Sequence, residues 1–428
     1  MSGLFLLAVL LTCLALGIPV AIALGTAGTL TILFFSDQTL LSVAQRFFHT
    51  MQVYPLLAVP FFILAGTFMT TGGAARRMVS FANALVGHYR GGLAIASVLA
   101  CAFFSAVSGS SPATVIAVGS IAIGGMVASG YTRPFATGVI CNAGTLGILI
   151  PPSIVLVIYG AVTETSVGAL FMAGILPGAL LTLLMMLTLR LVAGRLDWPR
   201  LEKAGWRTVL STGRQAFWAI MLVVLILGGI YAGAFTPTEA AAAAAVYALI
   251  IAVFVYREVP FSGIPSVFID SAKITAMLMF IIANAYVFAF VLTSEQIPQM
   301  ASQAIIDLGM PPWAFLIVVN ILLLIAGQFV DPSSVVLILA PLLFPIAVDL
   351  GIDPIHFGII MVVNLEIGLV TPPVGLNLFV ATGVSNMSLE NVIRAAAPWL
   401  LLLLGFLVVI TYVPAISLAL PRWMGVLS

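Results

Sequence analysis

The chain is a series of apolar runs about as long as a membrane core is thick, separated by short polar breaks. A hydrocarbon core requires about 20 apolar residues per helix. With 62% hydrophobic and only 7% charged residues over 428 positions, the chain has too few polar side chains for a soluble fold. The first run has no basic segment before it and stays apolar past any cleavage site, so we expect a membrane span there and no removable signal peptide. The sequence predicts an all-α polytopic membrane protein.

An internal duplication is the strongest pattern in the sequence. The stretch SGSSPATVIAVGS at 108 matches GQFVDPSSVVLIL at 327, and TRPFATG at 132 matches GIDPIHFG at 351. The first three pairs below are 220 residues apart and the last three are 221 apart: Pro112 with Pro332, Pro134 with Pro354, Gly138 with Gly358, Gly147 with Gly368, Pro151-Pro152 with Pro372-Pro373, and Pro177 with Pro398. One inserted residue reconciles the series, so the chain contains two copies of one unit.

Each copy is predicted to cross the membrane five times and to carry one re-entrant hairpin. Three spans come first, at about 4–17, 19–35 and 52–71, and again at about 214–234, 238–256 and 273–293. The hairpins follow at about 92–128 and 313–348, then spans broken by Pro-Pro at 132–161 and 355–385, then final spans at 168–190 and 395–418. The first 35 residues allow two spans or one long helix, and the repeat favours two. Because five is odd, the two copies must be inverted relative to one another.

The positions of the basic residues support this topology. When alternate loops are assigned to opposite sides, 13 of the 15 Lys and Arg residues fall on one side and only Arg46 and Arg422 on the other. Loops on the cytoplasmic side carry an excess of Lys and Arg. We therefore expect both chain ends to face outward, with the first hairpin entering from the cytoplasm and the second from outside.

The broken segment NAGTLGILIPPS at 142–153 is unsuited to a plain membrane helix. Backbone groups exposed to hydrocarbon cost several kcal/mol each, so a break persists only where protein or a wet cavity satisfies it. Proline frees carbonyl oxygens in the preceding turn, and carbonyl, hydroxyl and amide oxygens are ligands for hard cations. We predict two cation sites, one per copy, from these residues: Ser108, Ser110, Ser111, Asn142, Gly144 and Gly147; and Asp331, Ser333, Ser334, Asn364, Gly368 and Thr371.

The same motifs predict helix N-termini at the membrane midplane. Ser111-Pro112, Asp331-Pro332 and Thr371-Pro372 each place a capping residue before proline, whereas Pro151-Pro152 is expected to start a helix without a cap. Such ends direct free N–H groups and a partial positive charge inward, which suits an anion. No Lys or Arg falls in the predicted interior. We expect the anion to contact Ser110, Ser153, Ser333, Thr371, Pro152 and Pro373.

Structural alternatives exist for most of these residues. A serine in a membrane helix can bond the preceding turn instead of a ligand, and Pro-Pro can be a packing kink. Asp331 is more telling because a carboxylate inside a membrane is expensive, although it could simply cap a helix. Glu366 is a similar candidate within the second broken span. Glu239 completes a T-x-x-E capping box with Thr236, so a structural and a functional role are equally open there.

Five motifs carry a family resemblance. SGSSPAT, NAGTLGILIPPS, TPTEAAA, VDPSS and NLEIGLVTPPVGLNLFV occur along essentially the whole chain. Together they resemble the large membrane subunit of the TRAP transporters, the tripartite ATP-independent periplasmic transporters for organic acids. By this resemblance Ser110, Ser153, Glu239 and Asp331 stand at positions that matter in the family. The resemblance also implies that some relatives carry an acidic residue after the first hairpin tip, where this chain has Thr114 and so lacks that acidic ligand.

The resemblance implies an elevator-type transporter driven by sodium. A transport domain, 91–194 with 311–428, would slide against a scaffold, 1–90 with 214–310, with 195–213 as a cytoplasmic connection. Implied partners are a small four-helix membrane subunit, a periplasmic substrate-binding protein and the lipid bilayer of a bacterial or archaeal inner membrane. Substrates would be carboxylates such as C4-dicarboxylates, sialic acid or other sugar acids. Na⁺ is the expected coupling ion, and neither a cofactor nor a nucleic-acid partner is expected.

Three other classes of membrane protein are alternatives to a cation-coupled importer. An ATP-driven pump is disfavoured because no G-x-x-x-x-G-K-[ST] occurs, and the only lysines are Lys203 and Lys273. An intramembrane enzyme would need an H-E-x-x-H motif, a nucleophilic serine with an interior histidine, or paired interior aspartates. The sequence shows none of these patterns. A channel stays open as an alternative, since discontinuous helices also line pores.

Overall fold

The computed structural model describes residues 2–35, 40–50, 52–194, 198 and 201–427, and these residues form helices and connecting turns without a strand. The first copy contains α1 (Ser2–Ala15), α2 (Val20–Phe35), α3 (Leu40–Thr50), the 3₁₀ turn η1 (Tyr54–Leu57), α4 (Ala58–Thr71), α5 (Ala74–Val86), α6 (Gly92–Ser108), α7 (Ser111–Ala128), α8 (Arg133–Ala143), α9 (Leu146–Leu149), α10 (Ile154–Val162) and α11 (Val167–Ala193). The second contains α12 (Trp206–Tyr231), α13 (Pro237–Ile250), the π-turn η2 (Ile251–Val255), the 3₁₀ turn η3 (Phe261–Gly263), α14 (Ile264–Ser294), α15 (Ile297–Asp307), α16 (Pro312–Phe329), α17 (Pro332–Asp349), α18 (Pro354–Gly368), α19 (Leu376–Ser385), α20 (Leu389–Tyr412) and α21 (Pro414–Trp423).

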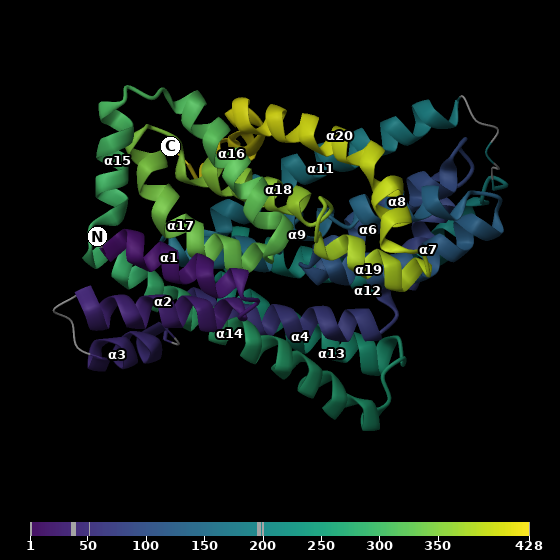
Figure 1. Cartoon of the computed structure of the whole chain (residues 1–428). Helices are drawn as coiled ribbons and strands as arrows, with labels where there is room; N and C mark the ends of the chain where they lie inside the picture. Colours follow the sequence, from purple (N-terminus) through teal and green to yellow (C-terminus); the bar gives the residue numbers. More distant parts are fainter. Residues whose placement is uncertain (1, 36–39, 51, 195–197, 199–200, 428) are drawn as a thin grey trace.

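The all-α polytopic fold is confirmed. Ten helices among the described residues are long and apolar enough to cross a membrane, and the first 35 residues form two helices rather than one. The two copies exchange partners, since α2 packs along α14 and α4 packs along α13. Figure 1 shows these four helices together along the lower side of the molecule. Reciprocal packing of this kind is what two related units around a common axis produce.

Both predicted hairpins are present, with their breaks at the predicted motifs. Helices α6 and α7 pack against each other, as do α16 and α17. The first tip is Gly109-Ser110, where Gly109 has a φ of +59°, a left-handed conformation that glycine adopts without steric cost. The second tip is Val330-Asp331, and Pro332 opens α17. Proline is favoured at the start of a helix because its missing N–H would have no partner there.

Three of the predicted helix starts are wrong in detail. The N-cap of α7 is Ser110, not Ser111, and its side chain makes no capping bond. No helix begins at Thr371-Pro372, because α19 starts only after Gly375. In the first copy α10 starts after Pro151-Pro152, and Ser153 caps it by accepting from the Leu156 N–H at 3.3 Å. The residue before a proline is disfavoured in the α conformation, so a Pro-Pro pair delays the helix.

Several helices also differ from the predicted spans. The final span, predicted to reach residue 418, ends at Tyr412, and Pro414 opens a separate helix α21. Helix α12 starts at Trp206, inside the predicted connection 195–213, of which 195–197 and 199–200 lie outside the described residues. The short amphipathic helices α3, α5 and α15 were not predicted; α5 follows α4 as α15 follows α14.

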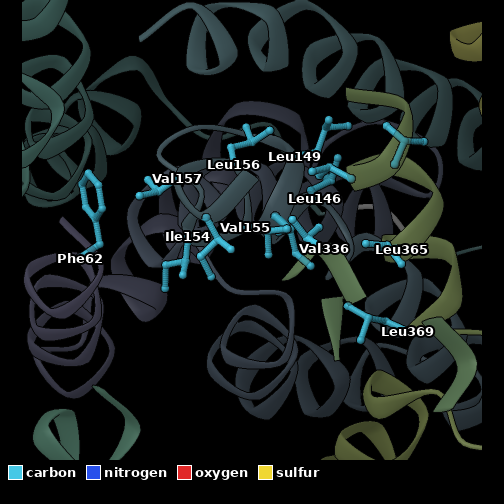
Figure 2. Packing of buried hydrophobic residues seen from close by; sticks show 14 of the residues in the cluster. Phe62, Leu146, Leu149, Ile154, Val155, Leu156, Val157, Val336, Leu365 and Leu369 are labelled. Carbon is cyan, nitrogen blue, oxygen red and sulfur yellow. The ribbon is translucent and has the colours of Figure 1, made fainter. Parts of the chain in front are cut away.

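One apolar core joins the two copies around the broken helices. Figure 2 shows Leu146, Leu149 and Val155 of the first copy beside Val336 and Leu365 of the second. All belong to a single buried cluster, and the contacts of α9 with α18 and of α10 with α17 run across the boundary between the copies. The first Pro-Pro break is therefore held in a packed apolar surround, whereas Pro373 and Val374 of the second break are exposed.

Cysteines placed at the two hairpin ends test the inverted topology. Ser129 and Leu350 are the C-caps of α7 and α17, and both have negative φ angles, so a cysteine fits each without strain. We expect Ser129→Cys to react with an impermeant thiol reagent only from the cytoplasm and Leu350→Cys only from outside. The unmodified chain is the control, because Cys13, Cys101 and Cys141 are all buried. Labelling of both variants from one side would contradict the inversion.

Candidate functional site

Both hairpin tips open into one cavity of about 450 Å³. The first tip contributes residues 108–113 and the second contributes residues 331–333. The opposite wall consists of Ile63, Thr67 and Thr70 from α4 and of Ile274, Met277 and Leu278 from α14. Two segments that lie 220 residues apart in the sequence thus meet at one site, as the repeat predicted.

In the first copy the hairpin tip lies directly against the broken helix. A Cβ atom on Gly147 would lie 2.6 Å from the carbonyl oxygen of Ser110, and one on Gly109 would lie 2.8 Å from the carbonyl oxygen of Pro152. Contacts this close between backbones are possible only at glycine. The structure therefore brings the predicted residues Ser110, Gly147 and Pro152 together.

Hydroxyl groups close the first tip. The hydroxyls of Ser108 and Thr114 are 3.0 Å apart, and Thr114 Oγ1 donates to the carbonyl of Ser110 at 2.9 Å. Thr114 is fully buried. At the position after the first tip the chain thus has a hydroxyl that bonds the tip's own backbone.

In the second copy the tip is organised by a carboxylate. Asp331 accepts from the Ser334 N–H at 3.1 Å and from the Ser334 hydroxyl at 2.5 Å, which caps α17. Ser333 is 8% exposed and lines the cavity together with Asp331. The capping role expected as the alternative for Asp331 is thus present, and the side chain also lies at the cavity.

The second broken helix contacts its hairpin at positions that the sequence did not single out. A Cβ atom on Gly368 would lie 2.6 Å from the carbonyl carbon of Gly327, and the N–H of Gly375 donates to the carbonyl of Gln328 at 3.1 Å. Gly147 and Gly368, paired by the repeat, therefore both lie against the backbone of their own hairpin. The contact point in the second copy lies in α16, a turn before the tip.

Other predicted ligands lie near the breaks without lining the cavity. The amide of Asn142 donates to the carbonyls of Gly138 and Ala396, and the amide of Asn364 donates to the carbonyl and side chain of Asn320. Both side-chain oxygens are buried and have no partner among the described residues. These further predicted residues also lie away from the cavity lining: Gly144, which packs on Val115; Thr371, which donates to the carbonyl of Ile367 at 2.6 Å; and Ser153, Ser334, Pro152 and Pro373.

The two glutamates have different surroundings. Glu366 is 1% exposed, interacts with the backbone of Ile148 and Leu149 across the copy boundary, and leaves one carboxylate oxygen without a partner among the described residues. Glu239 is exposed and forms the predicted capping box, with its carboxylate accepting from the Thr236 N–H at 2.8 Å. Glu239 lines neither the cavity at the hairpin tips nor the second, larger cavity of the structure.

A larger cavity of about 1330 Å³ lies beyond the tips, around the ends of α10, α12 and α14. Its wall is rich in hydroxyls, including those of Tyr286, Thr293 and Ser166. Neither cavity has a Lys or Arg among its described lining residues, and no cluster of three His, Cys, Asp or Glu side chains occurs in the described part of the chain. Apart from the imidazole of His49 in the larger cavity, the described polar side chains that line the two cavities offer hydroxyls and the carboxylates of Glu164 and Asp331.

Comparisons with known proteins agree with this architecture. Residues 7–416 match the family described as tripartite ATP-independent periplasmic transporter, DctM component. The chain is 62% identical to the C4-dicarboxylate TRAP transporter large permease protein DctM of Pseudomonas aeruginosa, over 94% of each chain. It is 42% identical to the isethionate TRAP transporter permease protein DctMQ of Oleidesulfovibrio alaskensis, over 95% of this chain and 64% of that longer one.

A solved structure supports the fold alone. The Alcanivorax borkumensis YdaH transporter matches with a TM-score of 0.58 at 16% identity, over 81% of this chain and 84% of that one. By its motifs, the ten apolar helices of its described residues and the match over residues 7–416, the chain belongs to the tripartite ATP-independent periplasmic transporters, as a DctM component embedded in the inner membrane through multiple spans.

Proposed function

We propose that the chain is a sodium-coupled importer of organic acids that works by an elevator mechanism. The observation that carries the proposal is the single cavity into which both hairpin tips open, facing α4 and α14. A carboxylate there would meet the N-terminus of α7 and the hydroxyls of Ser110 and Ser333. Helix N-termini favour anions, and the relatives named above for C4-dicarboxylates make a C4-dicarboxylate the first substrate to test.

Sodium would occupy one site per copy, between the hairpin and the broken helix of that copy. Oxygen ligands of the required kind are present at both places, from Ser108 and Ser110 in the first copy and from Asp331 and the Gly368–Thr371 backbone in the second. Hard cations are bound by such oxygens. The inward sodium gradient would drive accumulation of the anion, and any net positive charge that moves inward with the loaded site gains roughly 2.3 kcal/mol per 100 mV of membrane potential.

Packing supports the proposed division into scaffold and transport domain. Helices α2, α4, α13 and α14 pack on one another, whereas α7 and α8 pack on α19 and α20, and α16 packs on α18. The amphipathic helices α5 and α15 connect the two groups, since α5 contacts α6 and α15 contacts α17. Under the predicted topology the tip cavity faces the cytoplasmic halves of α4 and α14, and the larger cavity opens outward. Sliding of the tips along these two helices would move the site between the two sides.

The proposed partners are a small four-helix membrane subunit and a periplasmic binding protein. The fused DctMQ relative extends well beyond the length that matches this chain, as a fusion with a small subunit would.

Uptake into proteoliposomes tests the proposal. With the two partner proteins present, an inward sodium gradient should accumulate labelled C4-dicarboxylate above its external concentration. Potassium in place of sodium, or a collapsed sodium gradient, should leave only equilibration. A channel would equilibrate substrate under all three conditions, and that outcome would overturn the proposal.

A further inference from the structure

Asn377 joins the second broken helix to the first hairpin tip. It lies in the first turn of α19, and its side-chain amide donates to the hydroxyl of Ser111 at 2.7 Å and to the carbonyl of Cys141 at 3.4 Å. Ser111 is the first residue of α7 and Cys141 lies in α8, so both partners belong to the other copy. All three residues are fully buried. Asn377 lies in the quoted NLEIGLVTPPVGLNLFV motif but was not among the predicted site residues.

The backbone of Asn377 is fixed to the second proposed cation site. Its N–H donates to the carbonyl of Leu369 at 3.0 Å, across the Pro-Pro break. Two residues earlier, the Gly375 N–H donates to Gln328 of the second hairpin. The segment from Gly368 to Asn377 is thus bound to the second hairpin on one side and to the first tip on the other.

The side-chain oxygen of Asn377 has no partner among the described residues, although it is fully buried. A buried polar atom without a partner is costly, about 1–3 kcal/mol. An asparagine used only for packing would be replaced at lower cost by an apolar residue of the same size.

From this geometry we infer that Asn377 is a positioning residue that couples the two sodium sites, so that occupancy of one favours occupancy of the other. A cation bound around Gly368–Thr371 orders that segment, which fixes Asn377 and through its amide holds Ser111 at the start of α7. The first tip then has the geometry that binding of its own cation requires. Coupling between sites is reciprocal, and here it passes through a continuous chain of hydrogen bonds. The inference rests on the proposed sodium coupling.

The test compares sodium dependence in the full chain and two variants. Asn377→Ala removes the amide, and Asn377→Leu removes it while filling the same space. The matched control is Thr382→Ala, also in α19, whose hydroxyl donates to the carbonyl of Phe379 in its own helix. For each protein, uptake with the partner proteins and thermal stabilisation of the purified chain are measured over a range of sodium concentrations.

Wild type and Thr382→Ala should give sigmoidal curves with a Hill coefficient of about 2, whereas both Asn377 variants should fall towards about 1 with an at least ~5-fold higher half-saturation. A merely structural role would lower the melting temperature of the sodium-free protein without changing the Hill coefficient, and that result would overturn the inference. If Asn377→Ala does not fold, Asn377→Leu decides the question by the same curves. A wild type without sodium dependence would instead overturn the proposed function itself.

Discussion

Gly147→Ala should abolish sodium-driven uptake, although it adds only one methyl group. The new Cβ would lie 2.6 Å from the carbonyl oxygen of Ser110, 2.7 Å from its carbonyl carbon and 2.8 Å from Cα of Ser111. All three atoms belong to the backbone of the first tip, which cannot rotate away as a side chain can. The tip must move off the broken helix, and the oxygen ligands of the proposed cation site separate. Overpacking in a filled interior typically costs about 1–3 kcal/mol, so we expect the protein to fold and the site to fail.

The repeat supplies a second variant and matched controls for this prediction. Gly368→Ala should have the same effect, because its Cβ would lie 2.6 Å from the carbonyl carbon of Gly327. Gly124→Ala in α7 and Gly383→Ala in α19 add the same group where nothing lies within 4 Å. Alanine is preferred to glycine inside a helix by about 1 kcal/mol, so both controls should keep wild-type uptake. Wild-type sodium half-saturation in Gly147→Ala would show that the tip does not need to touch the broken helix.

The positions of the breaks were predictable because they depend on local chemistry. Glycine, serine and proline interrupt a helix wherever they cluster, and SGSSP, VDPSS and the two Pro-Pro pairs mark the breaks seen in the structure. The start of the next helix was predicted less well. Whether a helix resumes at once or after several residues depends on the residues just after the prolines, which are the capping Ser153 in the first copy and Val374-Gly375 in the second.

Contacts between distant segments could not be read from the sequence. Asn142 and Asn364 were predicted as cation ligands together with the tip residues, and the sequence did not indicate that their amides donate to carbonyls on α20 and α16. Packing between helices decides which neighbouring helix a given residue faces. The Pro-Pro breaks also change the rotation of the following helix about its axis. For the same reason the sequence did not indicate a role for Asn377, whose hydrogen-bond partners Ser111 and Cys141 lie more than 200 residues earlier. The helices α3, α5 and α15 were missed because amphipathic segments of this length fall below the hydropathy of a membrane span.

Substitutions of Asp331 should separate the effect of its negative charge from the effect of its helix capping. The carboxylate caps α17 through Ser334, and loss of an N-cap alone costs about 0.5–2 kcal/mol. Asp331→Ala removes both cap and charge, whereas Asp331→Asn keeps a capping oxygen and removes only the charge. We expect both variants to lose sodium-dependent uptake, because a neutral amide cannot balance a cation in a cavity that holds no other carboxylate among its described lining residues. The melting temperature should fall in Asp331→Ala and stay near wild type in Asp331→Asn.

Asp353 is the matched control for this experiment. It is also a half-buried N-cap, accepting from the N–H groups of Ile355 at 2.9 Å and of His356 at 3.1 Å, but it does not line the tip cavity. Asp353→Ala should therefore cost a similar amount of stability, about 0.5–2 kcal/mol, while sodium half-saturation stays unchanged. If instead Asp331→Asn transports with wild-type sodium dependence and only Asp331→Ala fails, the carboxylate acts through the helix alone. The second cation site would then have to be built from backbone and hydroxyl oxygens, as the first one is.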